Sequence, residues 1–207
     1  MTSMMRIDSI SSQPDMSGRY KILFQDGTSI RLYKQTVQDF GLYNGYEMSA
    51  ELFESLKQAA AKMSAKMRAV RIISASNVSK RDLEYRLIQK GENPDDAKQA
   101  VSWLQDMNLL DDEKTAEQLV ARCISKGYGI ARAKQMLYEK RIPKQYWEHV
   151  LSDYPEQLDV ISSYLDAHLP DPTDQKAVKK AIDALIRKGH SYSSIRKVME
   201  LNDPLED

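Results

Sequence analysis

One segment of this 207-residue chain recurs three times at a spacing of 48 to 50 residues, and this repeat restricts the fold more than any other feature. Residues 83–91 align with residues 133–141 and again with residues 181–189. The positions that recur are a leucine (Leu87, Leu137 and Leu185) and a lysine (Lys90, Lys140 and Lys188). A period of this length is that of a three-helix unit. Because such units bury their apolar faces against their neighbours, the sequence predicts a mainly α protein in which a tandem repeat of three three-helix units forms a curved array.

The repeat suggests where the parts of the chain begin and end. A small N-terminal β-hairpin region is expected at residues 1–48, and a connecting helix at residues 49–63. The three-helix units are expected at residues 64–112, 113–158 and 159–207. The recurring leucines should lie in the cores of these units.

Helix caps support these boundaries. Ser79 and Asn93 each stand three residues before an acid, which is the pattern of a helix N-terminus. Gly91 and Gly189 stand where the middle helices of the first and third units should end. In the second unit Arg141 occupies that place and departs from the glycine rule.

The N-terminal region follows a different pattern. Apolar and polar side chains alternate over residues 19–25, and a second such run covers residues 29–34. Asp26-Gly27 lies between the two runs and is a strong signal for a hairpin turn. A third strand is expected at residues 5–10. This β unit is too small to bury a core alone, so it should pack on the helices or on a partner.

The second unit should open with a helical hairpin. Asp111 and Asp112 can accept backbone N–H groups at a helix start, so a helix should begin near Glu113. Its buried face has the spacing i, i+3, i+4, i+7, at Ala116, Leu119, Val120 and Cys123. Gly127 and Gly129 both tolerate positive φ and stand where that helix must stop.

The same unit carries a local excess of positive charge, although the whole chain balances 30 basic against 30 acidic residues. Between positions 122 and 144 there are seven bases and one acid, and a second basic cluster follows in the third unit. Such an excess points to a face that meets an anionic partner, but it also fits a solvated helix face. The candidate contact residues for such an anionic partner are Arg122, Lys126, Arg132, Lys134, Lys140, Arg141, Lys144, Lys179, Lys180, Arg187 and Lys188.

No catalytic or metal-binding set stands out in the sequence. The three histidines are dispersed, and Cys123 has no companion at a metal-ligand spacing. No glycine-rich phosphate-binding motif is present. Asp111 and Asp112 fit a helix cap better than a metal or acid/base pair, because adjacent residues do not face one ligand together. We therefore expect no enzyme activity, no cofactor and no metal.

Hydropathy bears on the compartment. No apolar run approaches 18 residues, and the N-terminus, MTSMMRIDSI, turns polar at once. We therefore expect neither a membrane span nor a secretory signal, and a cytoplasmic location. A single cysteine excludes an intramolecular disulfide, and its place on an apolar helix face fits a small core residue better than a nucleophile.

A longer motif runs through the middle of the chain. It consists of Leu109-Leu110-Asp111-Asp112-Glu113, Ala116, Val120, Gly127, Gly129, Arg132 and Leu137. The N-terminal region ends in a second motif, Phe40-Gly41-Leu42 followed by Gly45 and Glu47. With the three tandem units, these residues resemble the pattern of the RecX family, regulators of the RecA recombinase. The departures are Asn108 for the usual glycine, Thr115 for the usual aromatic residue and Met136 where an acid is common.

The resemblance implies a non-enzymatic modulator that lies in the groove of the RecA–DNA filament and restrains its ATPase, strand exchange and SOS repressor cleavage. The RecA filament is the implied partner of a protein expected to be monomeric and free of membrane contacts. DNA would be contacted weakly, either directly or within the filament. The residues alone leave a second interpretation open, a stand-alone DNA-binding helical module whose bases hold phosphates.

Overall fold

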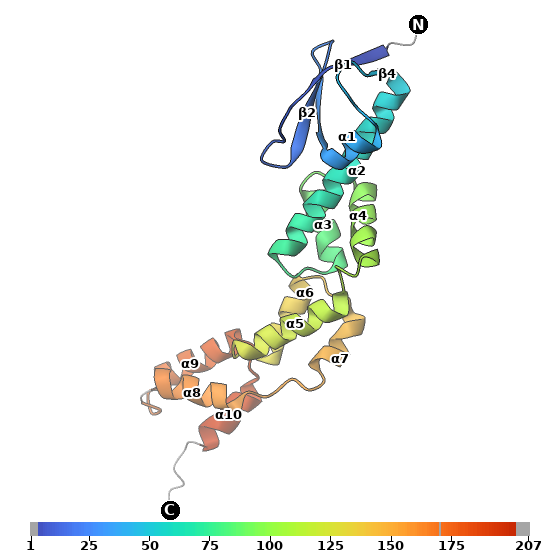
Figure 1. Cartoon of the computed structure of the whole chain (residues 1–207). Coiled ribbons are helices and arrows are strands. Elements are labelled where there is room, and N and C mark those ends of the chain that lie inside the picture. Colours follow the sequence, from blue (N-terminus) through green and yellow to red (C-terminus); the bar gives the residue numbers. More distant parts are fainter. Residues whose placement is uncertain (1–3, 170, 202–207) are drawn as a thin grey trace, which may run out of the picture. The chain divides into compact units, whose positions relative to one another are not determined.

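The computed structural model describes residues 4–169 and 171–201, and it divides into two compact units (Figure 1). The first unit comprises the chain up to residue 77 together with residues 83–110, and the second comprises residues 78–82 and the chain from residue 111 onward. In the first unit lie β1 (Met4–Ile10), β2 (Arg19–Phe24), β3 (Ser29–Tyr33), α1 (Lys34–Asp39), β4 (Glu47–Ser49), α2 (Ala50–Ala75) and α4 (Pro94–Asp106). The helix α3 (Lys80–Gln89) starts in the second unit and continues into the first.

The second unit contains helices throughout. They are α5 (Asp112–Ser125), α6 (Ile130–Glu139), the 3-10 helix η1 (Lys144–Tyr146), α7 (Trp147–Leu151), α8 (Leu158–His168), α9 (Gln175–Arg187) and α10 (Tyr192–Leu201). The prediction of a mainly helical chain with a small N-terminal β region is thus confirmed. Within residues 4–169 and 171–201, no helix combines the length and the apolar character that crossing a membrane requires.

The N-terminal sheet has four antiparallel strands in the order β3-β2-β1-β4. The predicted hairpin is confirmed: Gly27 has a φ of +83°, and the Asp26 carboxylate accepts the backbone N–H of Thr28 at 2.9 Å. The predicted third strand is β1. The strand β4 was not predicted; it pairs with β1 through Met48 and Met5. Three residues are too few to show an alternating pattern.

The long helix α2 serves both the sheet and the helices of the first unit (Figure 1). The Ser49 hydroxyl caps it by accepting the backbone N–H of Leu52 at 3.2 Å. Leu56, in its first half, belongs to the buried core of the sheet. Farther along, α2 packs against α4, and Ala65 and Ala69 are fully buried. One helix therefore contributes to two packing layers.

The middle helices of the predicted repeats, α3, α6 and α9, end in the same way. After each helix, one residue with positive φ precedes a residue whose backbone N–H donates to the carbonyl of the recurring leucine. The pairs are Glu92 to Leu87 at 3.1 Å, Ile142 to Leu137 at 3.0 Å and His190 to Leu185 at 3.1 Å. Gly91 and Gly189 supply the positive φ as predicted, and Arg141 adopts φ +53° in the same place.

All three recurring leucines are fully buried, as predicted. In the second unit, Leu137 packs with Leu119 and Ile142 in one core, and Leu185 packs with Ile161 and other residues of α8 to α10 in another. These features are compatible with tandem three-helix units, whose boundaries and curved array stay a prediction. The helix α2 continues without a break through residues 63 and 64, where we expected a connecting helix to give way to the first unit.

The predicted caps Ser79, Asn93 and Asp111 are confirmed, whereas Asp112 accepts the backbone N–H of Lys80 at 2.7 Å and so serves the start of α3 and not its own helix. Ser79 accepts the backbone N–H of Asp82 at 3.0 Å, and Asn93 accepts that of Asp95 at 2.9 Å. Asp111 accepts the backbone N–H groups of the two residues after Asp112, so α5 begins one residue before the predicted start.

Candidate nucleic-acid interface

The turn between α5 and α6 carries the two glycines of the central motif. Gly127 follows α5 with a φ of +65°, so its predicted role as a helix stop is confirmed. Gly129 is the N-cap of α6 and has a φ of −73°, a value that any residue adopts. The prediction that Gly129 serves for its positive φ is therefore wrong, and its role must come from the space around it.

That space is filled by the turn between α9 and α10. The Gly129 N–H donates to the carbonyl of Lys188 at 3.0 Å, and the Ala131 N–H donates to the carbonyl of Gly189 at 3.2 Å. A Cβ atom on Gly129 would lie 2.1 Å from the Gly189 oxygen, so only glycine fits. Because α6 has no side-chain cap, the carbonyls of the α9–α10 turn satisfy N–H groups at its start.

An equivalent contact occurs at the start of α3, in residues 78–82 of the second unit. There the Ser79 hydroxyl donates to the carbonyl of Lys140 at 2.7 Å. Ser79 and Gly129 occupy matching repeat positions, as do Lys140 and Lys188. Two lysines that our sequence analysis assigned to an interface thus also place their backbone carbonyls at helix starts.

Three predicted contact residues carry charges near Cys123 of α5. Burial raises the pKa of the Cys123 thiol, and the nearby charges of Arg132, Lys126 and Arg122 oppose that rise. The thiol is buried and lies 3.3 Å from the sulfur of Met136, so its predicted role as a core residue is confirmed. Arg122 and Lys126 are exposed and Arg132 is half-buried. We call these three bases the α5–α6 cluster.

Lys188, from the second predicted basic cluster, lies where the α9–α10 turn meets the start of α6. We call this place the junction. Its ammonium nitrogen stands 4.2 Å from the centre of the Tyr164 ring, a cation–π contact. A Cβ atom on the adjacent Gly189 would lie 2.3 Å from the backbone nitrogen of Arg132, so the backbones of α6 and the α9–α10 turn touch there. The structure therefore brings the backbone at Lys188 beside the start of α6, although Lys188 lies 56 positions farther along the chain than Arg132.

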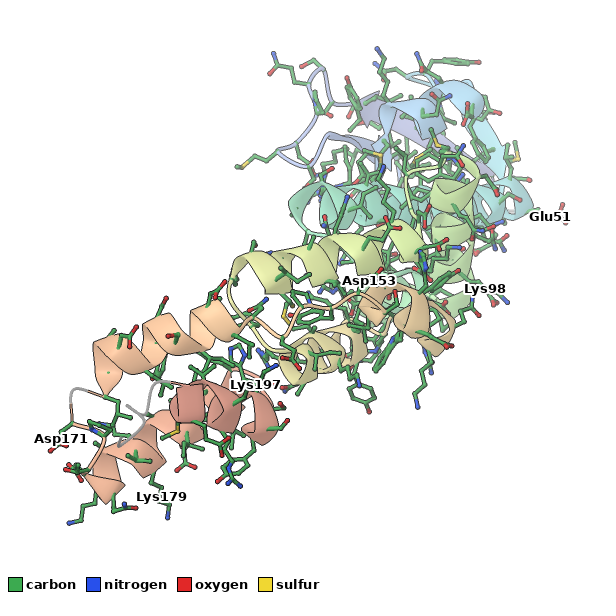
Figure 2. The ribbon with its side chains drawn as sticks, turned by 90° about the horizontal axis from the view of Figure 1, so that it is seen from below. Glu51, Lys98, Asp153, Asp171, Lys179 and Lys197 are labelled. Carbon is green, nitrogen blue, oxygen red and sulfur yellow. The ribbon has the colours of Figure 1, made fainter. Side chains whose placement is uncertain are left out.

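The remaining predicted contact residues have other surroundings. Arg141 forms an ion pair of 3.1 Å with Asp82, whose side chain is 4% exposed, so much of its charge is balanced within the fold. Lys134 and Lys144 are exposed on α6 and η1, and Lys140 is half-buried. The other bases are on α9, where Lys179 and Lys180 occupy the first half and Arg187 the last position, all exposed. Figure 2 shows Lys179 well apart from Lys197 of α10.

A buried histidine also belongs to the junction. His190 Nε2 lies 3.1 Å from the carbonyl oxygen of Gly127, which fits the tautomer with its proton on Nε2. Its Nδ1 is buried and meets no hydrogen-bond partner among the residues that the structure describes. Burial lowers the pKa of His190, the Lys188 charge adds to this decrease, and the Gly127 hydrogen bond opposes it. Folding therefore favours the neutral form of His190.

This environment predicts a pH-dependent stability. The unfolded chain binds a proton at His190 near the ordinary pKa of 6.5, and the folded chain binds it only at lower pH. The free energy of unfolding should therefore fall as the pH drops below 6.5 towards the lowered pKa. Urea unfolding at about pH 7.5 and about pH 5.5 should show a smaller difference for His190→Gln than for the unchanged chain. His149→Gln, at an exposed position, is the control, and equal pH dependence in all three proteins would refute the assignment.

One set of titratable side chains was missed by our sequence analysis. Glu113 and Glu117 of α5 and His149 of α7 are all exposed, and their ligand atoms lie within 4.8 Å of one another. His149 Nε2 stands 4.0 Å from a Glu113 oxygen. The two acids are four residues apart on one helix, which is a readable signal, but the histidine comes from a separate helix. Exposed acidic groups of this kind are common, so we assign them no site.

Comparison with known proteins places the chain. No protein-family model matches it. It is 30% identical over 197 residues to "Regulatory protein RecX" of Streptococcus uberis, covering 86% of this chain and 71% of that protein. The same name belongs to a Vibrio parahaemolyticus protein, 25% identical over 150 residues (71% and 97% of the two chains), and to a Clostridioides difficile protein, 23% identical over 199 residues (93% of both).

Two solved structures share the fold. A crystal structure of regulatory protein RecX has a TM-score of 0.63 at 19% identity and covers 95% of this chain and 99% of its own. A crystal structure of RecX from Lactobacillus salivarius has a TM-score of 0.58 at 20% identity and covers 69% of this chain and 97% of its own. Fold and relatives together define the class, a mainly helical regulatory protein with a small N-terminal sheet. The chain belongs to the RecX family.

Proposed function

We propose that this protein is a non-enzymatic inhibitor of the RecA recombinase. It binds in the groove of the RecA–DNA filament and restrains ATP hydrolysis, strand exchange and SOS repressor cleavage. Membership in a family of regulatory proteins supports this proposal. The observation that carries it is the α5–α6 cluster, three basic side chains on two successive helices, beside which the α9–α10 turn packs.

The charge distribution fits such a target. A filament presents DNA phosphates and protein surface along one groove, and clustered bases on a neutral protein attract phosphate locally without strong long-range attraction to all DNA. The ion pair between Arg132 and Glu139, at 3.6 Å, is partly exposed and contributes little, so Arg132 can exchange it for phosphate. Several weak contacts along one groove then combine through effective concentration.

The test is a charge reversal of the three bases of the cluster together with Lys134, an exposed base of α6. We expect the fourfold substitution of Arg122, Lys126, Arg132 and Lys134 by glutamate to keep the helical fold and to weaken filament binding by at least about tenfold, since each lost phosphate contact also adds repulsion. The readouts are the melting temperature and the single-stranded-DNA-dependent ATP hydrolysis of the cognate RecA with the protein titrated in.

A matched control keeps the interpretation specific. The substitution of Lys21, Lys34, Lys62 and Lys98 by glutamate makes the same change in net charge at exposed positions of the first unit. This control should still inhibit RecA. If the fourfold cluster variant melts normally and still inhibits RecA normally, the four bases do not contact the filament and form only a solvated helix face.

The second candidate is the stand-alone DNA-binding module, which the basic cluster also favours. The two functions differ in their preferred target. A modulator should bind the assembled filament clearly more tightly than bare single-stranded DNA at one physiological salt concentration, and removal of residues 159–207 should weaken that preference. Equal affinities for the two targets would favour the DNA-binding module.

A further inference from the structure

A cavity of about 470 Å³ lies in the first unit, and its lining includes no residue of the α5–α6 cluster. Five basic side chains line it: Arg19, Arg68, Arg71, Arg86 and Lys90. We call it the arginine cavity. Its wall also contains hydroxyl groups, including those of Tyr33 and Ser76, and an apolar part that includes Ile72 and Ala75, and more of the lining is polar than apolar. Cavities for small organic ligands are mostly apolar, so this lining indicates a strongly anionic ligand.

Three elements of the first unit bring these bases together. Arg68 and Arg71 lie three residues apart on α2 and therefore share one face of that helix. Arg86 of α3 and Lys90, the residue directly after that helix, lie four residues apart and share a face in the same way. Arg19 is the first residue of β2.

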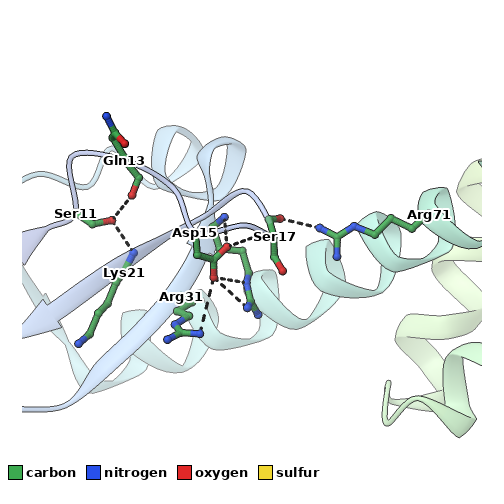
Figure 3. A network of polar contacts seen from close by, with 8 residues as sticks. Ser11, Gln13, Asp15, Ser17, Lys21, Arg31 and Arg71 are labelled. Carbon is green, nitrogen blue, oxygen red and sulfur yellow. Dashed lines mark hydrogen bonds and ion pairs between the residues drawn. The ribbon is translucent and has the colours of Figure 1, made fainter.

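Hydrogen bonds hold the loop before β2 in place. The Asp15 carboxylate accepts the backbone N–H groups of Ser17 at 2.8 Å and of Arg19 at 3.0 Å. These bonds, chiefly that of Arg19, lower the pKa of Asp15 and keep it charged. The guanidinium of Arg71 donates to the carbonyl of Ser17 at 2.7 Å, which ties α2 to this loop (Figure 3). These bonds hold the loop before β2 against α2 on one side of the cavity.

The positive charge is only partly balanced. Asp15 pairs with Arg19 at 3.1 Å, and Glu92 pairs with Arg68 at 2.8 Å. Among the residues that the structure describes, no carboxylate lies within 4.0 Å of the charged nitrogens of Arg71 or Lys90. The cavity therefore keeps a net positive charge, which an anion can neutralise.

We propose that the arginine cavity binds the phosphodiester backbone of DNA. Guanidinium groups bind phosphate through paired hydrogen bonds, and arginines on two helices and a strand can reach successive phosphates of one DNA strand. The lining offers a single aromatic ring, Tyr33, so the cavity recognises backbone rather than base sequence. This inference does not depend on the proposed function, because it concerns DNA alone and a different unit of the chain.

The test measures DNA binding without RecA. In the double variant Arg71→Gln/Lys90→Gln, anisotropy of a labelled single-stranded oligonucleotide of mixed sequence should show a roughly tenfold loss of affinity at low salt. The slope of log affinity against log salt should shrink by about 1.4, which corresponds to two lost phosphate contacts. The control Lys62→Gln/Lys98→Gln removes the same charge from exposed positions of α2 and α4 outside the cavity, and should keep the original slope.

Two further variants test whether the loss of affinity comes from lost phosphate contacts and not from a disturbed cavity wall. Lys90→Gln alone leaves the Arg71 bond to Ser17 intact and should lower the slope by about half as much, about 0.7. Arg71→Lys keeps the charge and should restore most of the affinity. Equal losses in the cavity and control variants would overturn the proposal, as would no loss in either. Displacement of the oligonucleotide by equimolar ATP would also overturn it, by showing that the ligand is a mononucleotide.

Discussion

Gly189→Ala is expected to lower the free energy of unfolding by about 3 to 5 kcal/mol. Two effects add at this position. The backbone has φ +92°, which costs an L-residue roughly 1 to 2 kcal/mol. The new Cβ would also lie 2.3 Å from the nitrogen and 2.6 Å from the Cβ of Arg132, so the α9–α10 turn would have to leave α6.

The repeat supplies a matched control for this substitution. Gly91 occupies the equivalent turn and has nearly the same φ of +89°, but a methyl group added to it would meet no atom within 4 Å. Gly91→Ala should therefore cost only the backbone strain, roughly 1 to 2 kcal/mol. Urea unfolding followed by circular dichroism measures both variants. Equal losses would contradict the close approach between the α9–α10 turn and α6.

Leu137→Ala is expected to cost about 2 to 5 kcal/mol, because it removes three carbon atoms from a fully buried position and leaves a cavity. Leu137 packs with Leu119 and Ile142 in the core of α5 to α7, where a rigid set of helices can collapse only in part.

The matched control for this second substitution is Leu109→Ala. Leu109 is 54% exposed, so the same chemical change should alter stability by less than about 0.5 kcal/mol. Denaturant midpoints of the two variants at one protein concentration make the comparison. A similar cost at both positions would mean that the recurring leucine does not anchor a core.

The sequence predicted those parts of the fold that local chemistry determines. Capping side chains, the Asp26-Gly27 turn and the recurring leucines each act on residues a few positions away, so their effect can be read along the chain. The role of Gly129 could not be read in this way. It depends on Gly189, which lies 60 positions farther on. From the sequence alone, a glycine that is needed for positive φ cannot be told from one that is needed because a side chain would clash.

The candidate sites were harder to predict, because a count of charges along the sequence finds only bases that are close together in the chain. The α5–α6 cluster was visible, since its bases are close in sequence with few acids between them. The arginine cavity was not, because residues 64–112 contain eight bases and eight acids, which cancel in any such count. Folding separates them: α2 and α3 turn bases to one side. For Arg141 the count gave the opposite error. It was counted as a base available to a partner, but it pairs with Asp82, which lies 59 positions away in the sequence.

The helix α2 has a consequence for how the first unit opens. Because a single helix supplies Leu56 to the sheet core and also packs on α4, neither layer can detach without fraying the same backbone. We therefore expect the sheet layer and the α4 layer to open together, as one cooperative unit. A partly unfolded state in which only one half of α2 stays helical should be unfavourable. The arginine cavity is lined by residues of α2, of α3 and of the loop before β2. A ligand that binds there stabilises the folded form of the whole unit, so it should slow hydrogen exchange in the sheet and in α4 together.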